Sequence, residues 1–136
     1  MTHYTVLIDG EDGAYGVIFP GLIGCTAMGG TIEEALANSV EALRDWTEVV
    51  EAKGGAIPAP MSPDAIRRDP DYADDFADGA ILGSVVLVRR LGRPQKANMS
   101  LDSGILAAID ETASRLGITR SALVERMAEE KLPEFA

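Results

Sequence analysis

The first thirty residues carry β-branched and aromatic side chains in short runs that turn residues separate. Residues 5–8 and 15–19 form two such runs, and the Asp-Gly-Glu-Asp-Gly sequence at residues 9–13 between them is typical of a hairpin turn. Residues 22–28 have the composition of a third strand, which the glycines at 29 and 30 bring to an end. The pattern therefore predicts three strands before any helix.

From Thr31 onward, apolar positions recur every three or four residues, as expected for an amphipathic helix. Thr31 is a favourable N-cap, and Glu33 and Glu34 place negative charge in the first turn, where the helix dipole favours it. A glycine pair at residues 54–55 ends the predicted helix. The apolar stripe that would lie on the sheet contains Ile32, Ala35, Leu36, Val40, Leu43, Trp46, Thr47 and Val50.

A proline-rich connector at residues 57–63 follows this helix, because prolines remove amide donors and favour extended backbone. Residues 64–79 are strongly acidic and predict at most a short helical turn. The apolar, β-branched run at residues 80–88 is typical of a buried strand. The first domain is therefore expected to have the element order β-β-β-α-β.

The last third of the chain predicts a strand followed by two short helices. Residues 96–101 alternate between polar and apolar side chains, as in a strand that packs on one face. Asp102 or Ser103 can cap a helix that Gly117 ends, and Thr119 can cap a second helix. One copy has too little core to fold alone, so we expect a homodimer in which two copies pair these strands.

Two strands paired in this way form a ribbon that fits the major groove of B-DNA. Lys96 would donate to guanine, Asn98 would read adenine with two hydrogen bonds, and Ser100 would discriminate less between bases. A helical dimerisation hairpin without a DNA role is the alternative. Phosphate contacts are predicted for four residues of the linker and the second helix, namely Arg93, Thr119, Arg120 and Ser121.

Charge is divided unevenly along the chain, whose overall net charge is −10. Residues 1–88 carry 4 Lys and Arg against 15 Asp and Glu, which gives −11, whereas residues 89–136 carry 8 against 7, which gives +1. An acidic first domain favours a basic protein partner and repels nucleic acid, unless its charge only maintains solubility. Carboxylates that would steer such a partner lie in the acidic segment, namely Asp64, Asp69, Asp71, Asp74, Asp75 and Asp78.

A lasting contact with such a partner also needs an apolar centre, because charges at the rim of an interface mainly change the association rate. Tyr72 and Phe76 are the candidates for this centre, and their alternative role is to anchor the acidic segment on its own domain. The residues predicted to bind the partner protein are therefore Asp71, Tyr72, Asp74, Asp75 and Phe76.

Catalytic, metal and cofactor chemistry is not expected in this chain. Cys25 is its only cysteine and His3 its only histidine, which excludes an intramolecular disulfide and a Cys/His zinc site within one chain. Asp9, Glu11 and Asp12 lie in a predicted turn, where solvation explains their charge better than metal-dependent catalysis. No apolar run is long enough to span a bilayer and the N-terminus lacks a signal-peptide pattern, so we expect a cytoplasmic protein.

Two short motifs and a proline segment in the first domain together form a recognisable pattern. Residues 12–25 contain Phe-Pro-Gly-Leu-Ile-Gly-Cys, residues 30–36 contain Thr-Ile-Glu-Glu-Ala-Leu, and a proline segment follows at residues 57–60. Together they resemble the HicB antitoxin family. This resemblance implies a reduced ribonuclease-H-like fold that binds HicA, a small ribonuclease with a double-stranded-RNA-binding-domain-like fold, and shields its catalytic histidine. Family members end in a helix-turn-helix or a ribbon-helix-helix, and the alternation at residues 96–101 favours the latter.

The expected fold class is α+β, with a reduced ribonuclease-H-like domain at residues 1–90, a linker at 91–95 and a ribbon-helix-helix domain at 96–136. The expected protein is a non-enzymatic antitoxin that neutralises a HicA-type mRNA-cleaving toxin and represses its own operon by binding operator double-stranded DNA. It would form a homodimer through the C-terminal domain, or a tetramer. The alternative is a stand-alone ribbon-helix-helix repressor whose first domain senses another ligand or protein.

Overall fold

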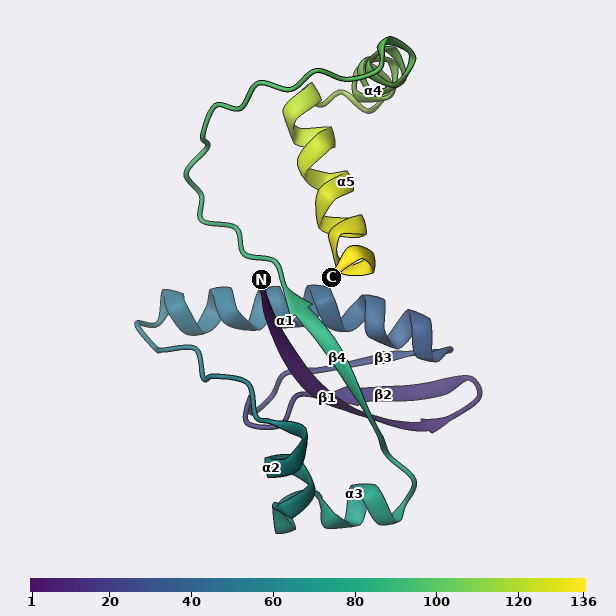
Figure 1. The fold of residues 1–136 in the computed structure, drawn as a ribbon, viewed down its shortest axis with the longest axis vertical. Helices are drawn as coiled ribbons and strands as arrows, with labels where there is room; N and C mark the ends of the chain where they lie inside the picture. Colours follow the sequence, from purple (N-terminus) through teal and green to yellow (C-terminus); the bar gives the residue numbers. More distant parts are fainter. The chain divides into compact units, whose positions relative to one another are not determined.

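A four-stranded antiparallel sheet forms the centre of the first of two units in the chain (Figure 1). The computed structural model describes residues 1–136, and the units are Met1–Arg89 and Arg90–Ala136. The second unit contains two helices, α4 (Ser103–Leu116) and α5 (Arg120–Phe135). The elements of the first unit are β1 (Thr2–Glu11), β2 (Ala14–Ile18), β3 (Thr26–Gly29), α1 (Ile32–Ala52), α2 (Pro63–Arg68), the 3-10 helix η1 (Pro70–Tyr72), α3 (Ala73–Ala77) and β4 (Ile81–Leu87).

The strands are ordered β3-β2-β1-β4, so β1 and β2 lie inside the sheet and β3 and β4 form its edges. β1 pairs with β2 as a hairpin in which Leu7 faces Ile18, and it pairs on its other side with β4, where Leu7 faces Leu82. Three strands, one long helix and a last strand therefore follow one another as the sequence predicted, and the α+β class is confirmed.

The third strand begins at Thr26, four residues later than the sequence pattern predicted. The residues before it form a tight turn, in which the Cys25 amide donates to the Leu22 carbonyl at 3.1 Å. Gly21 and Gly24 each have a φ of +85°, a left-handed conformation that favours glycine and departs from regular strand geometry. The strand prediction was wrong here because Leu22 and Cys25 are buried by the turn rather than by strand pairing.

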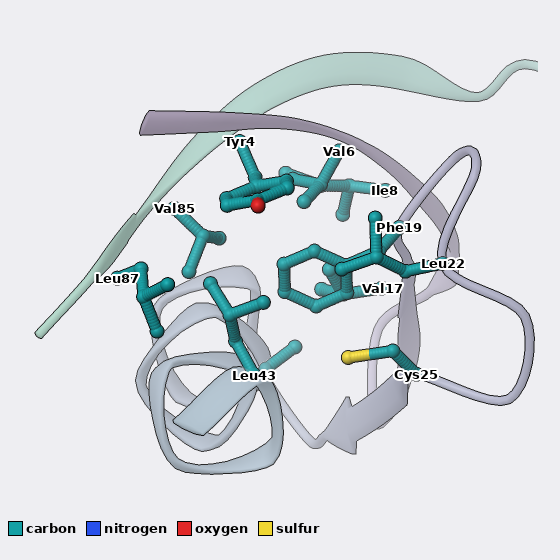
Figure 2. Close-up of a cluster of buried hydrophobic side chains, with 11 residues drawn as sticks. Tyr4, Val6, Ile8, Val17, Phe19, Leu22, Cys25, Leu43, Val85 and Leu87 are labelled. Carbon is teal, nitrogen blue, oxygen red and sulfur yellow. The ribbon is translucent and has the colours of Figure 1, made fainter. Parts of the chain in front are cut away.

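One face of the sheet packs against α1 and encloses the main hydrophobic core (Figure 2). Alternate residues of each strand point to this side, so Val6 and Val17 are fully buried and meet Leu43 of the helix. Thr31 caps α1 as predicted, since its hydroxyl oxygen accepts a hydrogen bond from the Glu34 amide at 3.1 Å. The buried members of this core are Tyr4, Val6, Ile8, Val17, Phe19, Leu22, Cys25, Ala35, Leu43, Val85 and Leu87.

The acidic segment forms α2, η1 and α3 rather than the single short helical turn predicted for it. Ser62 caps α2 by accepting a hydrogen bond from the Ala65 amide at 3.1 Å, and Pro63 occupies the first turn. Asp69 accepts a hydrogen bond from the Asp71 amide at 3.0 Å and caps η1. The segment is more helical than predicted because these caps, and the apolar residues between them, stabilise short helices in spite of the many charges. A second cluster results, in which Ile18, Met61, Tyr72, Phe76 and Leu82 pack against Leu7, Ile66 and Ala80.

Helix α4 begins and ends, and helix α5 begins, where the sequence predicted. Asp102 caps α4 by accepting hydrogen bonds from the next amides, Gly117 ends it with a φ of +68°, and Thr119 caps α5. No strand lies between Leu87 and Ser103, and a single chain offers the segment at residues 96–101 no second strand to pair with. The ribbon strand therefore stays a prediction. None of the helices combines the length and apolar character that crossing a lipid bilayer requires.

Candidate functional sites

The second unit leaves most of its apolar side chains exposed in a single chain. Only Ala113 and Leu123 are buried on the two helices, where they pack α4 and α5 together. Larger apolar residues of the same helices, among them Ile105, Leu116 and Met127, remain exposed. An apolar surface of this extent on so small a unit is typical of an association surface.

The three predicted base-reading residues lie together in the segment of the second unit that precedes α4. Lys96, Asn98 and Ser100 are all exposed, and they alternate with Met99 and Leu101, which are 66% and 43% exposed. The apolar and polar members of the segment thus have no packing partner within one chain. Such a segment can gain one by pairing with its copy in a second chain, which would bury the apolar members and leave the polar ones outward.

The predicted phosphate-binding residues have different surroundings. Thr119 uses its hydroxyl to cap α5 by accepting a hydrogen bond from the Ala122 amide at 3.1 Å, and Ser121 and Arg93 are exposed. Arg120, by contrast, donates two hydrogen bonds of 2.7 Å to the two carboxylate oxygens of Asp110. This hydrogen bond from Arg120 lowers the pKa of the Asp110 carboxyl below its usual range.

Sequence reasoning missed the Arg120–Asp110 pair and a second ion pair within the same unit. Arg90 donates to both carboxylate oxygens of Glu129 on α5, with a separation of 2.7 Å for its Nη2 atom. Neither pair has a short-range signal, because ten and 39 residues separate the partners along the chain. In the first unit, Arg89 similarly pairs with Glu51 near the end of α1. The basic run that precedes the linker is therefore partly engaged within the chain.

The residues predicted to bind a partner protein lie on the face of the sheet opposite α1. Tyr72 and Phe76 are half-buried and pack on the second cluster, and the Tyr72 hydroxyl oxygen accepts a hydrogen bond from the Gly21 amide at 3.2 Å. These contacts fit the alternative role, in which both side chains anchor the acidic segment on its own domain. Asp71 and Asp74 are exposed beside them, whereas Asp75 is half-buried.

The potential nucleophile and metal ligands of the first unit are not grouped into a site. Cys25 is buried in the main core, and burial raises the pKa of its thiol to about 11. His3 lies near the start of β1, away from Cys25 in the sequence and exposed. No three His, Cys, Asp or Glu side chains lie close enough together to hold a metal ion. Cys25 is therefore a packing residue at neutral pH.

The family model and the solved structures that match this chain both point to HicB-like antitoxins. A family model described as HicB_like antitoxin of bacterial toxin-antitoxin system matches residues 4–128. A UPF0150 protein of Synechocystis sp. is 40% identical over 57 residues, which cover 41% of this chain and 72% of that protein. The crystal structure of the Burkholderia pseudomallei antitoxin HicB is similar with a TM-score of 0.51 and 27% identity, over 98% of each chain. A chain of the HicA3 and HicB3 toxin-antitoxin complex has a TM-score of 0.53 and 26% identity, over 64% of this chain and 99% of that chain.

Proposed function

Because this chain belongs to the family of HicB-like antitoxins of bacterial toxin–antitoxin systems, we propose that it neutralises a HicA-type mRNA-cleaving ribonuclease and represses its own operon. One domain would perform each task. The first, at residues 1–90, would hold the toxin on a reduced ribonuclease-H-like fold. The second, at residues 96–136, would bind operator DNA as a ribbon-helix-helix dimer, and residues 91–95 would link them.

The exposed alternation of polar and apolar side chains at residues 96–101 is the observation that supports the DNA-binding half of the proposal. Met99 and Leu101 need a second copy to become buried, whereas Lys96, Asn98 and Ser100 suit the edges of bases in a major groove. Two paired copies would also supply the core that Ala113 and Leu123 alone do not provide. The same association would produce a homodimer through the C-terminal domain, or a higher oligomer such as a tetramer.

The charge of the first unit supports the toxin-binding half. An RNA-cleaving toxin must offer cationic side chains to the phosphates of its substrate. A surface with a net charge of −11 over residues 1–88 attracts such a partner and disfavours nucleic acid. A known complex between HicA3 and HicB3 contains a chain with this fold, which makes the same pairing the natural one to test.

Full-length variants separate the two halves of the proposal. Changing Lys96 and Asn98 together to alanine should abolish operator-specific binding in gel-shift and anisotropy assays, because both base contacts are lost. The same variant should still restore growth when it is co-expressed with the toxin of the neighbouring reading frame. A variant that binds operator DNA normally, or one that no longer restores growth, would contradict the division of labour between the domains.

The second candidate function is a stand-alone repressor whose first domain responds to another ligand or protein. It shares the exposed segment at residues 96–101 and therefore the same DNA-binding result. The two candidates differ in the growth assay, because a repressor without a toxin partner leaves a co-expressed HicA-type toxin fully active.

A further inference from the structure

A rigid turn between β2 and β3 holds an isoleucine side chain out into solvent. Ile23 is 93% exposed, although Leu22 and Cys25 on the same turn are buried in the core. Gly21 and Gly24 allow the left-handed backbone of this turn, and two hydrogen bonds hold it in place, from the Leu22 amide to the Phe19 carbonyl at 3.0 Å and from the Cys25 amide to the Leu22 carbonyl at 3.1 Å. An exposed apolar side chain on a fixed backbone loses little conformational entropy when it enters a complex.

Helix α1 supports this turn along one of its flanks. The Trp46 indole N–H donates a hydrogen bond to the Ile23 carbonyl at 3.0 Å. The side-chain amide of Asn38 donates to the Met28 carbonyl at 2.8 Å. Residues 38 and 46 are about two helical turns apart, so the flank of α1 that carries both lies against the turn and β3. Val49 follows Trp46 by three residues on this flank and is 53% exposed. We call Ile23, Trp46 and Val49 the Ile23 surface.

Carboxylates line the outer border of the Ile23 surface. Glu41 and Asp45 are exposed and lie next to the flank that carries Trp46 and Val49, with Asp45 four residues before Val49. Arg44 lies on the opposite flank of the helix together with Glu51, whereas the exposed C-cap Lys53 follows Val49 by four residues on the same flank. The position of Glu51 is fixed by its ion pair with the arginine that follows β4, the other edge strand. The Ile23 surface therefore has an apolar centre, carboxylates along its solvent-facing side and one cation, Lys53, at the end of the helix.

We infer that the Ile23 surface is the docking site of the toxin, an inference that rests on the proposed function. A tight interface needs a fixed apolar anchor near its centre and complementary charge around it. Ile23 and Val49 supply the anchor, and the carboxylates of Glu41 and Asp45 match the cationic surface that an RNA-binding toxin requires.

The acidic segment on the opposite face of the sheet is less suitable as the centre of an interface. Its large apolar side chains, Ile66, Tyr72 and Phe76, pack on the domain itself. Among residues 62–80 no large hydrophobic side chain is exposed, so Asp71 and Asp74 have no apolar centre beside them. These carboxylates act over distance on the rate of encounter, whereas the Ile23 surface determines how long the complex lasts.

Binding of matched variants to the toxin tests the inference. The probe is the toxin of the neighbouring reading frame with its catalytic histidine changed to alanine, titrated calorimetrically into full-length antitoxin. Ile23→Asp should weaken binding at least about tenfold, as for the loss of a central anchor. The control Ile81→Asp, at a 51% exposed position on edge strand β4, should stay within about threefold of the unmodified protein.

Two further results would overturn the inference. One is normal affinity of the Ile23→Asp variant, and the other is a larger loss from Asp71→Asn with Asp74→Asn than from Ile23→Asp. Circular dichroism and thermal unfolding confirm that each variant is folded.

Trp46 provides a direct readout, because it is the only tryptophan in the chain. Incorporated as 5-fluorotryptophan in the antitoxin alone, it gives one fluorine resonance, which should shift when the toxin is added. Tight binding of the toxin without such a shift overturns the docking site while leaving the proposed function intact. Absence of any calorimetric binding to the unmodified antitoxin instead refutes the proposed function, and the docking site with it.

Discussion

Arg120 donates two hydrogen bonds of 2.7 Å to the carboxylate of Asp110, and these bonds join the first residue of α5 to the middle of α4. Both side chains remain about half exposed, so the pair orients the guanidinium more than it stabilises the fold. The same guanidinium was predicted to bind a DNA phosphate. Asp110 and a phosphate would therefore compete for one cation at the N-terminus of α5.

This competition predicts the effect of Asp110→Asn on operator binding. Removal of the carboxylate frees Arg120 and deletes a negative charge near the DNA, so affinity should rise. The slope of the logarithm of the binding constant against the logarithm of salt concentration should steepen by up to about one. Arg120→Ala should flatten the slope and serves as the control. An unchanged slope in both variants would show that Arg120 makes no phosphate contact.

The exposed Leu101 should be required for association of two chains. Leu101→Asp places a charge where the predicted ribbon buries an apolar side chain, so the variant should be monomeric by analytical ultracentrifugation at concentrations that keep the unmodified protein dimeric. Its operator binding should be lost as well. Glu125→Ala, an exposed change on α5, is the control. A dimeric Leu101→Asp variant would exclude this segment from the dimer interface.

Asn98 should contribute to base discrimination rather than to general affinity. Asn98→Ala should reduce the preference for operator over unrelated DNA by about 1–3 kcal/mol per contact, because a bidentate contact with adenine is lost. The dimer should stay intact, since Asn98 lies on the polar side of the alternation. Anisotropy titrations with operator and with scrambled duplexes check this, and Ser100→Ala should have the smaller effect. Equal weakening on both duplexes would assign Asn98 to the phosphate backbone instead.

The sequence predicted best those elements that depend on residues only a few positions apart. Thr31, Asp102 and Thr119 cap their helices because an N-cap needs only a side-chain oxygen near amides two or three residues on. Gly117 ends α4 for an equally local reason. Residues 22–25 were wrongly predicted as part of a strand, because apolar side chains such as Leu22 and Cys25 become buried in a tight turn as well as in a strand.

The candidate sites were less predictable, because they depend on contacts between distant parts of the chain. Nothing near Tyr72 in the sequence indicates that its hydroxyl meets the Gly21 amide or that it packs over β1. The exposure of Ile23 likewise follows from the turn, since an isoleucine between Leu22 and Gly24 reads as part of a buried strand. The alternation at residues 96–101 is visible in the sequence, whereas a single chain does not test the predicted burial of Met99 and Leu101 against a second copy.

Leu43 should be among the most sensitive core positions. It is fully buried on α1 against the sheet, so Leu43→Ala should lower the free energy of unfolding by about 2–5 kcal/mol through lost burial and a cavity. Val49→Ala on the exposed flank of the same helix should change it by less than about 0.5 kcal/mol. Urea unfolding of the two variants makes the comparison. Equal destabilisation would contradict the assignment of the two flanks.

Cys25 should give the first unit a specific sensitivity to alkaline pH. Burial raises the pKa of its thiol from an ordinary 9.0 to about 11 in the folded protein, so the unfolded chain releases this proton at lower pH. The contribution of Cys25 to stability is complete below pH 9.0 and falls as the pH rises towards about 11, because ionisation then favours the unfolded state.

Cys25→Ala removes the titration, so urea unfolding at increasing pH should show a steeper loss of unfolding free energy for the unmodified protein than for this variant. Iodoacetamide should correspondingly alkylate the folded protein slowly at pH 9.0 and the urea-unfolded protein rapidly. Parallel pH profiles for the two proteins, together with rapid alkylation of the folded one, would mean that the thiol is accessible to solvent.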